Sequence, residues 1–493
     1  MPLLQLFNLL QLLNLLNLFQ LLNLLQLFKL HRHHHHDHHN TTATTTATAT
    51  HHTHTMKLTI LKLAAHALLA AGALALATRA TAQTNTLQNA IQSGKATIDA
   101  RLRYEFVDQD GMPDNANAIT LRTRLGYTTA PFYGLDAGIM AENVVALDND
   151  YYDSVNDKPQ GNTTKSKLYP QVMDPAVTEV NQAWLRYTAP ADIATQVTIG
   201  RQRIAYDNLR FIGDVAWRQD NQTFDAIALK NTTIKNLTIN YAWLWRVNRV
   251  QGDQRDWRSN SHLINLSYAA CQYATIAAYG YLLDFHNPTL PAAAAATATQ
   301  ASTKTFGASL AGAPAITTDI KLNYRLEYAG QNNYGHNNVG YTAAYLAAEL
   351  GATALAKYNL TLGCERLTTD KGQGFRMPLG TNHAFNGWSD FILPTGNNFV
   401  NGLRDYYLRA TIALPANLQL IACYHKLDKD WQAAGDTKGK AYGNEYDASL
   451  AYRLNKNIAF MVKTASFAAS KTGDQNLATP NVSKVWLQTE YTF

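Results

Sequence analysis

Two neighbouring stretches, residues 95–108 and 118–129, alternate between apolar and polar side chains. A period of two predicts β-strands, with one set of side chains on each face. The apolar face includes several aromatic residues, and the polar face carries Asp99, Arg101, Arg103, Glu105, Arg122 and Arg124. Unpaired charges are too costly to bury in a dry core. The pair is therefore either an amphipathic hairpin over a soluble core or part of a membrane barrel with lipid outside and water inside.

Similar strand-like segments fill the rest of the chain, and no long helical pattern interrupts them. We count about eighteen: 95–108, 118–129, 135–146, 178–188, 195–204, 223–230, 237–248, 261–269, 275–285, 303–312, 320–330, 341–351, 358–367, 403–414, 418–428, 445–454, 458–466 and 482–493.

The connections between these segments alternate in length. Short ones, such as 130–134 and 415–417, alternate with longer ones, notably 147–177 and 368–402. Short periplasmic turns and long external loops are typical of outer-membrane barrels. We therefore predict an all-β fold, a single transmembrane antiparallel up-and-down β-barrel of about 18 strands in the bacterial outer membrane. A barrel of this size is expected to enclose a water-filled lumen.

The first 82 residues differ from the rest in composition. Residues 1–55 are of low complexity, with a repeat of two apolar residues and one polar residue followed by His-rich and Thr/Ala-rich runs. Residues 56–82 have a basic start, an apolar core and a small-residue cleavage site, which indicates a secretory signal peptide. We expect that 1–55 are not part of the native protein and that 83–493 form the barrel.

Composition and motifs narrow the function. The 493 residues carry a formal net charge of +6, but residues 1–82 supply five of the 42 basic and one of the 36 acidic residues, so nothing suggests nucleic-acid binding. The three cysteines are far apart in the sequence, and no catalytic, phosphate-binding or metal-binding motif is found. We predict no enzyme activity, no cofactor and no metal.

Basic residues on the predicted inner face suggest how the lumen works. Arg101, Arg103, Arg122 and Arg124 share one facing, and Lys484 on the last strand is expected beside them when the barrel closes. Lys321 and Arg325 add charge elsewhere on the wall. Rings of Arg and Lys favour anion passage. The alternative is that neighbouring acidic residues pair with these bases and stiffen the wall.

Two sequence blocks resemble the alginate-export porin family. The first includes Gly200-Arg201-Gln202, Arg210-Phe211-Ile212-Gly213 and Trp217-Arg218-Gln219, and the second includes His383-Ala384-Phe385-Asn386-Gly387-Trp388 and Asp390. The resemblance implies an eighteen-stranded outer-membrane channel with an electropositive constriction that passes a polyuronate by diffusion. It also adds Arg201 to the pore-lining candidates, which are Arg101, Arg103, Arg122, Arg124, Arg201, Lys321 and Arg325.

We therefore predict a channel for anionic solutes, with an acidic polysaccharide such as alginate or its oligomers as the expected cargo. The other expected partners are outer-membrane lipid and the barrel-assembly machinery, which the C-terminal strand ending at Phe493 would engage. Three alternatives stay open: a general or nutrient-uptake porin without polyuronate specificity, a plugged structural or adhesive barrel, and an enzyme embedded in a barrel.

Overall fold

The computed structural model describes residues 86–287, 290, 292–391, 400–431, 441–470 and 480–493. All described residues belong to one compact unit. The predicted low-complexity extension and signal peptide lie outside the described residues.

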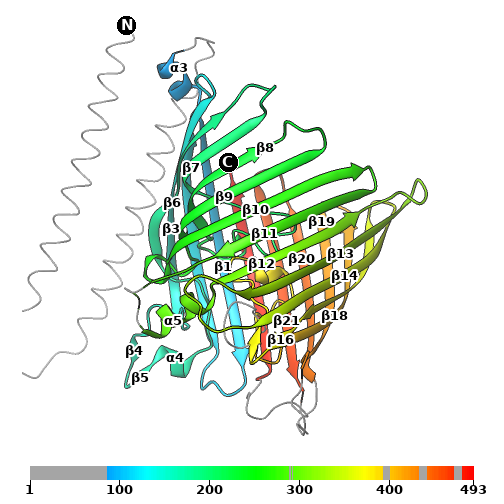
Figure 1. Ribbon diagram of the computed structural model, residues 1–493. Helices are drawn as coiled ribbons and strands as arrows, with labels where there is room; N and C mark the ends of the chain where they lie inside the picture. Colours follow the sequence, from blue (N-terminus) through cyan, green and yellow to red (C-terminus); the bar gives the residue numbers. More distant parts are fainter. Residues whose placement is uncertain (1–85, 288–289, 291, 392–399, 432–440, 471–479) are drawn as a thin grey trace, which may run out of the picture. The chain divides into compact units, whose positions relative to one another are not determined.

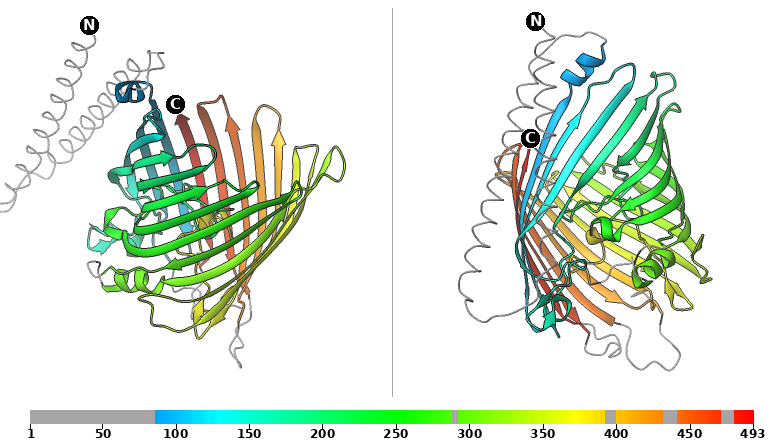
Figure 2. Two further views of the ribbon diagram at one scale, coloured as in Figure 1. Left: turned by 45° about the horizontal axis from the view of Figure 1, so that its top comes forward. Right: turned by 90° about the vertical axis from the view of Figure 1, so that its left-hand side faces the viewer.

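Eighteen strands form one closed antiparallel barrel, as the sequence predicted (Figure 1). Each wall strand pairs with the next along the chain, and the last strand pairs with the first from Asp99↔Thr492 to Gln109↔Val482. Figure 2 shows the oblique strands of this continuous wall from two further sides. The wall strands are β1 (Lys95–Gln109), β2 (Ala116–Thr128), β3 (Leu135–Asp150), β6 (Val177–Thr188), β7 (Thr195–Gln202), β8 (Thr223–Asn231), β9 (Leu237–Asn248), β10 (Trp257–Cys271), β11 (Ala274–Leu283), β12 (Thr303–Gly312), β13 (Ile320–Asn333), β14 (Thr342–Ala354), β15 (Tyr358–Leu367), β18 (Leu403–Leu414), β19 (Leu418–Asp428), β20 (Ala441–Arg453), β21 (Ile458–Ala469) and β22 (Val482–Thr492).

The facing of the first two strands agrees with the sequence pattern. In the β1–β2 register Arg101 lies opposite Arg122, and Leu102 opposite Leu121. Leu102 is 45% exposed on the outside, whereas Arg103 and Arg122 are buried inside. A one-residue slip would move every side chain to the other face, so the alternating pattern and the pairing register support each other.

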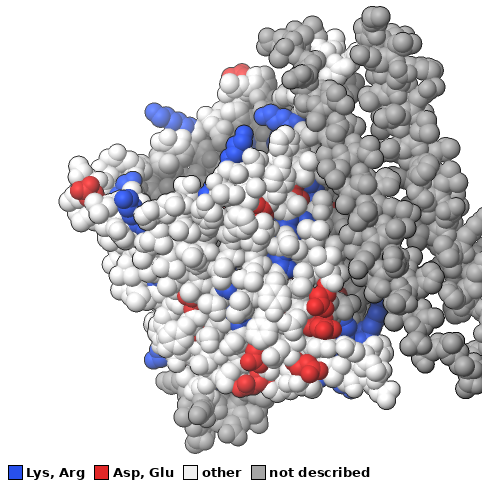
Figure 3. Space-filling view, turned by 180° about the vertical axis from the view of Figure 1, so that it is seen from behind, with Lys and Arg blue, Asp and Glu red and all other residues white. Residues whose placement is uncertain are grey.

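The outer surface is an apolar belt. Large side chains stay exposed on many strands, among them Leu326, Leu346, Leu362, Leu408 and Val462. In the space-filling view most of the visible wall is uncharged (Figure 3). Such a belt suits contact with hydrocarbon, because lipid-facing and lumen-facing residues alternate along a transmembrane strand. Among the described residues, no helix is both long and apolar enough to cross a membrane.

Short turns join the strands at the end of the barrel that carries the C-terminus and the helix α3 (Leu87–Gln92), and long loops leave the other end (Figures 1 and 2). The expected alternation of loop lengths is wrong at the first hairpin. Both strands extend further than predicted, so the connection 110–115 is no longer than the turn 129–134. An alanine-rich part of the connection between β11 and β12 forms the helix α5 (Ala292–Gln300).

Smaller elements lie in the long connections. They are β4 (Pro159–Gln160), β5 (Thr163–Thr164), α4 (Lys165–Leu168), the 3₁₀ helix η1 (Asp253–Arg255), β16 (Thr369–Asp370), β17 (Gln373–Gly374) and the 3₁₀ helix η2 (Asn382–Ala384).

Two long connections contact residues deep inside the barrel, and we call residues 203–222 and 368–391 the luminal loops. They touch each other through a parallel bridge between Ile212 and Leu379, and the Gly213 N–H donates to the Leu379 carbonyl at 2.8 Å. Ile212, Leu379 and Phe375 belong to a buried apolar cluster. The expectation of a simply water-filled lumen is therefore wrong at this level, because the luminal loops pack against part of the inner wall.

The apolar belt predicts the effect of a charge on the outer face. Leu362 lies in the middle of β15 and is 61% exposed. Leu362→Arg should destabilise the folded barrel by about 2–4 kcal/mol if the site lies near the bilayer midplane. Urea titrations in lipid vesicles measure this free energy. The matched control is Ile316→Arg, in the turn between β12 and β13, where Ile316 is equally exposed. Equal costs at both sites would contradict a lipid-facing Leu362.

Candidate luminal site

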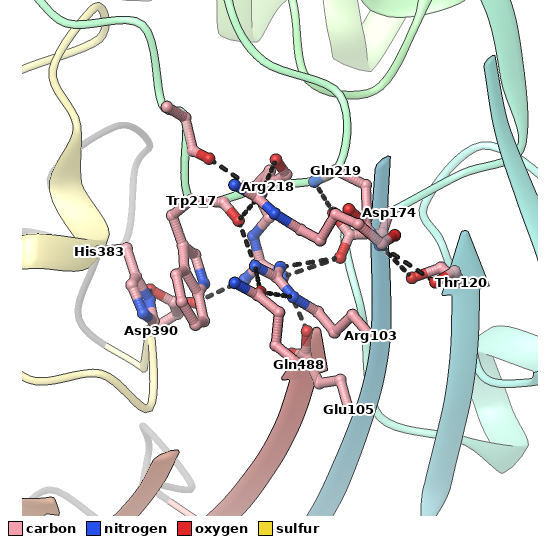
Figure 4. Close-up of polar contacts among 12 residues, drawn as sticks. Arg103, Glu105, Thr120, Asp174, Trp217, Arg218, Gln219, His383, Asp390 and Gln488 are labelled. Atoms are coloured by element: carbon pink, nitrogen blue, oxygen red, sulfur yellow. Dashed lines mark hydrogen bonds and ion pairs between the residues drawn. The ribbon is translucent and has the colours of Figure 1, made fainter. Parts of the chain in front are cut away.

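The arginines of β1 hold the first luminal loop. The Arg101 Nη1 group donates to the carbonyls of Ala216 and Trp217 at 3.1 and 3.2 Å. The Arg103 Nη2 group donates to the Trp217 carbonyl at 2.6 Å, and its guanidinium carbon lies 4.1 Å from the centroid of the Trp217 ring (Figure 4). Backbone carbonyls of the first luminal loop thus accept hydrogen bonds from arginines of the wall.

Carboxylates from three parts of the chain neutralise the buried charge behind this contact. Asp174, just before β6, lies 3.5 Å from Arg103 and 3.9 Å from Arg218. Arg218 of the luminal loop also pairs with Glu105 at 3.3 Å and with Asp390 of the second luminal loop at 2.5 Å (Figure 4). Removing one member of such a network leaves an uncompensated buried charge. The network therefore fixes both luminal loops to the wall.

The arginines of β2 pair mainly with the wall itself. Arg122 pairs with Asp99 of β1, and Arg124 pairs with Glu142 of β3. Arg124 also reaches the Asn221 side chain of the first luminal loop. The sequence left two interpretations of these arginines, a charged lining of the lumen and ion pairs within the wall. The structure has features of both, because the two arginines face the lumen and are paired with carboxylates.

The other three predicted site residues lie apart from this group. Arg201 pairs with Asp225 of the next strand at 2.8 Å and donates to the Val180 carbonyl. Arg325 pairs with Glu327 on its own strand at 2.7 Å. Lys321 is exposed near the start of β13, close to the short-turn end. The fold therefore brings together Arg101, Arg103, Arg122 and Arg124, and a role in conduction stays a prediction for all seven. Lys484 lies opposite Val107 of β1, and its Nζ atom is 4.0 Å from Glu105 and 3.7 Å from Asp390.

A second cationic group was missed by the sequence analysis. The Lys463 Nζ atom of β21 lies 4.0 Å from the centroid of the Trp217 ring and 3.7 Å from that of Trp388. His383 stacks on Trp217 with centroids 4.3 Å apart. We call these four residues the Lys463 cluster. The family-like run 383–390 pointed to two of its members, but the alternation in β21 was too blurred to face Lys463 inward.

His383 is held between two charged groups. Its Nε2 atom lies 2.7 Å from the Lys463 Nζ atom, and its Nδ1 atom lies 2.7 Å from an Asp390 carboxylate oxygen. An ammonium group can only donate, so Nε2 accepts and the Nδ1–H donates to Asp390. Burial lowers the pKa of His383 well below its ordinary value, and the Lys463 charge lowers it further against the opposing effect of Asp390. His383 is therefore neutral in the docked loop at pH 7.

Two adjoining cavities lie beside these residues. The first, of about 400 Å³, is lined by members of the Lys463 cluster together with Tyr407 and His425. The second, of about 500 Å³, is lined by Asn208 and Arg325 among others. Arg409 of β18, with Ala384 and Phe385 of the second luminal loop, lines both. The wall residues of the second cavity lie toward the short-turn ends of their strands, so this space is on the periplasmic side of the luminal loops.

Comparison with known proteins decides the family. The sequence model of the alginate export family matches residues 95–472. The chain belongs to the alginate export family. Among curated protein sequences no match to the chain is found.

Solved porin structures share the fold of this alginate export family member. Acinetobacter baumannii OccAB2 is 14% identical with a TM-score of 0.62, over 82% of this chain and 99% of that one. Pseudomonas aeruginosa OpdL is 16% identical with a TM-score of 0.58, over 81% and 99%. Pseudomonas aeruginosa OpdK, solved with vanillate, is 14% identical with a TM-score of 0.59, over 81% and 98%. The family match and the barrel establish an outer-membrane channel for solutes, in contact with membrane lipid.

The Asp174 network predicts a large stability effect. Asp174→Asn leaves Arg103 and Arg218 short of one buried negative charge, so we expect a loss of about 3–5 kcal/mol in the free energy of unfolding. Urea unfolding monitored by tryptophan fluorescence measures the loss. Asp430→Asn is the control, because Asp430 pairs with the more exposed Arg366 and Arg404 and should cost about 0–1 kcal/mol. Similar losses in the two variants would show that the network does not hold the loops.

His383 predicts a pH-dependent conductance. Its pKa is lower in the docked loop than in a free loop, where it should lie near 6.5. The undocked form therefore binds more protons below about pH 6.5, and acid favours undocking. Single-channel conductance should increase between pH 7.5 and pH 5. His383→Gln should lose this increase, and an unchanged pH profile in that variant would exclude His383 as its source.

Proposed function

We propose that this channel conducts anionic solutes, with an acidic polysaccharide such as alginate or its oligomers as the cargo. The observation that carries the proposal is the pair of adjoining cavities, where cationic side chains and aromatic rings line the same space. A uronate unit combines a carboxylate with a sugar ring. Arg pairs with carboxylates through its planar fork, and aromatic rings offer flat apolar surfaces to a sugar.

Arg409 is placed to meet such a solute from the periplasmic side. It lines both cavities, and its side chain is 37% exposed. Its ion pair with Glu349 is loose, at 3.7 Å. Arg103 and Lys463, in contrast, are buried and engaged by the luminal loops. In the proposed function Arg409 contacts the solute first, and movement of the loops then exposes the deeper cations.

The family match supports export of a polyuronate. A second candidate function, uptake of small carboxylates, is supported by one of the similar structures. OpdK, a barrel of the same fold, was solved with vanillate, a small aromatic carboxylate. Uptake of small carboxylates would need the same cationic side chain, Arg409, but would not need both of the adjoining cavities. We further propose that residues 56–82 direct export of the chain, and that β22 and Phe493 engage the barrel-assembly machinery.

Arg409→Gln tests the proposed function. Uronate oligomers should block the wild-type conductance in planar bilayers, and loss of one charge-assisted hydrogen bond should weaken this block roughly tenfold. The reversal potential should shift toward lower anion preference. Arg366→Gln is the control, since Arg366 lies on the opposite face of its strand from the luminal residue Glu365.

The choice of blocking solute separates the candidates. Neutral glucose oligomers of the same length should block weakly if the cation matters. Block by vanillate but not by uronate oligomers would favour small-carboxylate uptake. Equal block of wild type and Arg409→Gln by uronate oligomers would exclude Arg409 from the path.

A further inference from the structure

Three carboxylates converge on the inner wall, away from the Lys463 cluster. Glu142 of β3, Glu179 of β6 and Asp220 of the first luminal loop each place an oxygen within 4.8 Å of the others. Glu142 is 1% exposed and Asp220 is 0% exposed. Like charges this close repel one another, and burial adds a desolvation cost. The cluster needs a source of positive charge.

The nearby arginines neutralise part of this charge. Arg124 pairs with Glu142, whereas Arg201 is engaged by Asp225. Within the described part of the chain, Glu179 and Asp220 have no ion pair. With Glu142 matched by Arg124, two negative charges remain, the number that a divalent cation balances.

Several buried oxygen atoms here also lack donors. Considering the described residues alone, both carboxylate oxygens of Asp220 and one of Glu142 have no hydrogen-bond partner. The amide of Asn181 is fully buried and contacts Glu142, with its Nδ2 atom 3.4 Å from Oε2, yet its Oδ1 atom is unpartnered in the same set of residues. Buried polar atoms in native proteins normally have partners. The Asp220 carboxylate, which is fully buried with both oxygens unpartnered in this set of residues, therefore points to a missing cation.

The local structure holds Asp220 in place without using its side chain. On one side, the Gln219 side chain donates to the Thr120 hydroxyl at 2.8 Å. On the other side, Asn221 accepts from Asn181 at 3.1 Å and from Arg124. Both neighbours of Asp220 are therefore anchored to the wall, and the Asp220 carboxylate is left among the other acidic groups.

We propose that Asp220, Glu142 and Glu179 form a binding site for a divalent cation of the calcium class. All donors are oxygen atoms, and together they offer about as many as Ca²⁺ takes from protein when water completes its shell of 6–8. The absence of sulfur and imidazole from this donor set disfavours softer metals. The ion joins β3 and β6 to the first luminal loop, and so helps to keep that loop inside the barrel. This inference does not depend on the cargo.

The test is calcium binding to the full-length barrel, purified in detergent and stripped with a chelator. Isothermal titration with CaCl₂ at pH 7.5 should show saturable binding, and the thermal unfolding midpoint should rise with CaCl₂ concentration. NaCl of equal ionic strength should not reproduce the rise. Asp220→Asn should weaken binding by about tenfold or more, because ligand charge sets affinity in such sites.

Two further variants keep the result interpretable. Glu327→Gln removes a buried luminal carboxylate whose oxygens are already paired with Arg325 and Tyr279, and it should bind Ca²⁺ like wild type. Glu179→Gln should also weaken calcium binding, and it replaces Asp220→Asn in the test if that variant fails to fold.

Protons are the alternative neutralising charge. Burial and the neighbouring carboxylates raise the pKa of Asp220 well above its ordinary value. If protons alone balance the cluster, wild type should bind no Ca²⁺ and should lose stability as the pH rises through the raised pKa of Asp220. That result, or equal calcium affinity in wild type and Asp220→Asn, would overturn the proposal.

Discussion

The structure depends on one constraint: charged side chains of the wall must face inward and must find partners there. The outer face of β1 and β2 contacts hydrocarbon, so their arginines have no alternative direction. Inside, Arg103 and Arg122 are both buried, and the first luminal loop contacts Arg103. A guanidinium that has lost water requires a carboxylate or a carbonyl. The positions of the luminal loops follow from this requirement.

The partners are of two kinds, and the difference bears on conduction. Arg122 and Arg124 pair with carboxylates of neighbouring wall strands, which remain in place whatever the loops do. Arg103 and Lys463 instead depend on Trp217 and His383 of the luminal loops. Loop displacement would therefore expose a particular subset of cations. In the proposed function, carboxylates of the solute replace these loop contacts.

One region of the inner wall instead has an excess of negative charge. Around Asp220 carboxylates outnumber cations, although the arginines of β1 and β2 lie on the adjacent strands. The first luminal loop therefore makes two kinds of contact with the wall. Trp217 and Arg218 join the network of arginines and carboxylates around Asp174, and Asp220 lies among the carboxylates of Glu142 and Glu179. A loop fixed by both kinds of contact is held more firmly than one fixed by either alone. Under the two proposals together, release of this loop would depend on cations as well as on anions.

The sequence by itself determined the wall of this protein. Strands such as β12, β15, β18 and β19 have the bounds that alternation predicted, because side-chain period is a local property that lipid and water select directly. It also identified the arginines of β1 and β2 as a group, since they lie on neighbouring strands.

The tertiary structure decided the interior. Arg101 meets Ala216, and Lys463 meets His383, across separations of 115 and 80 residues. No local pattern encodes such contacts, because they arise only when the closed barrel confines the loops that connect its strands. The same holds for the acidic pocket, whose members come from two wall strands and a loop. Local periodicity specified which way the side chains point in the regularly alternating strands, and confinement within the barrel specified what they meet.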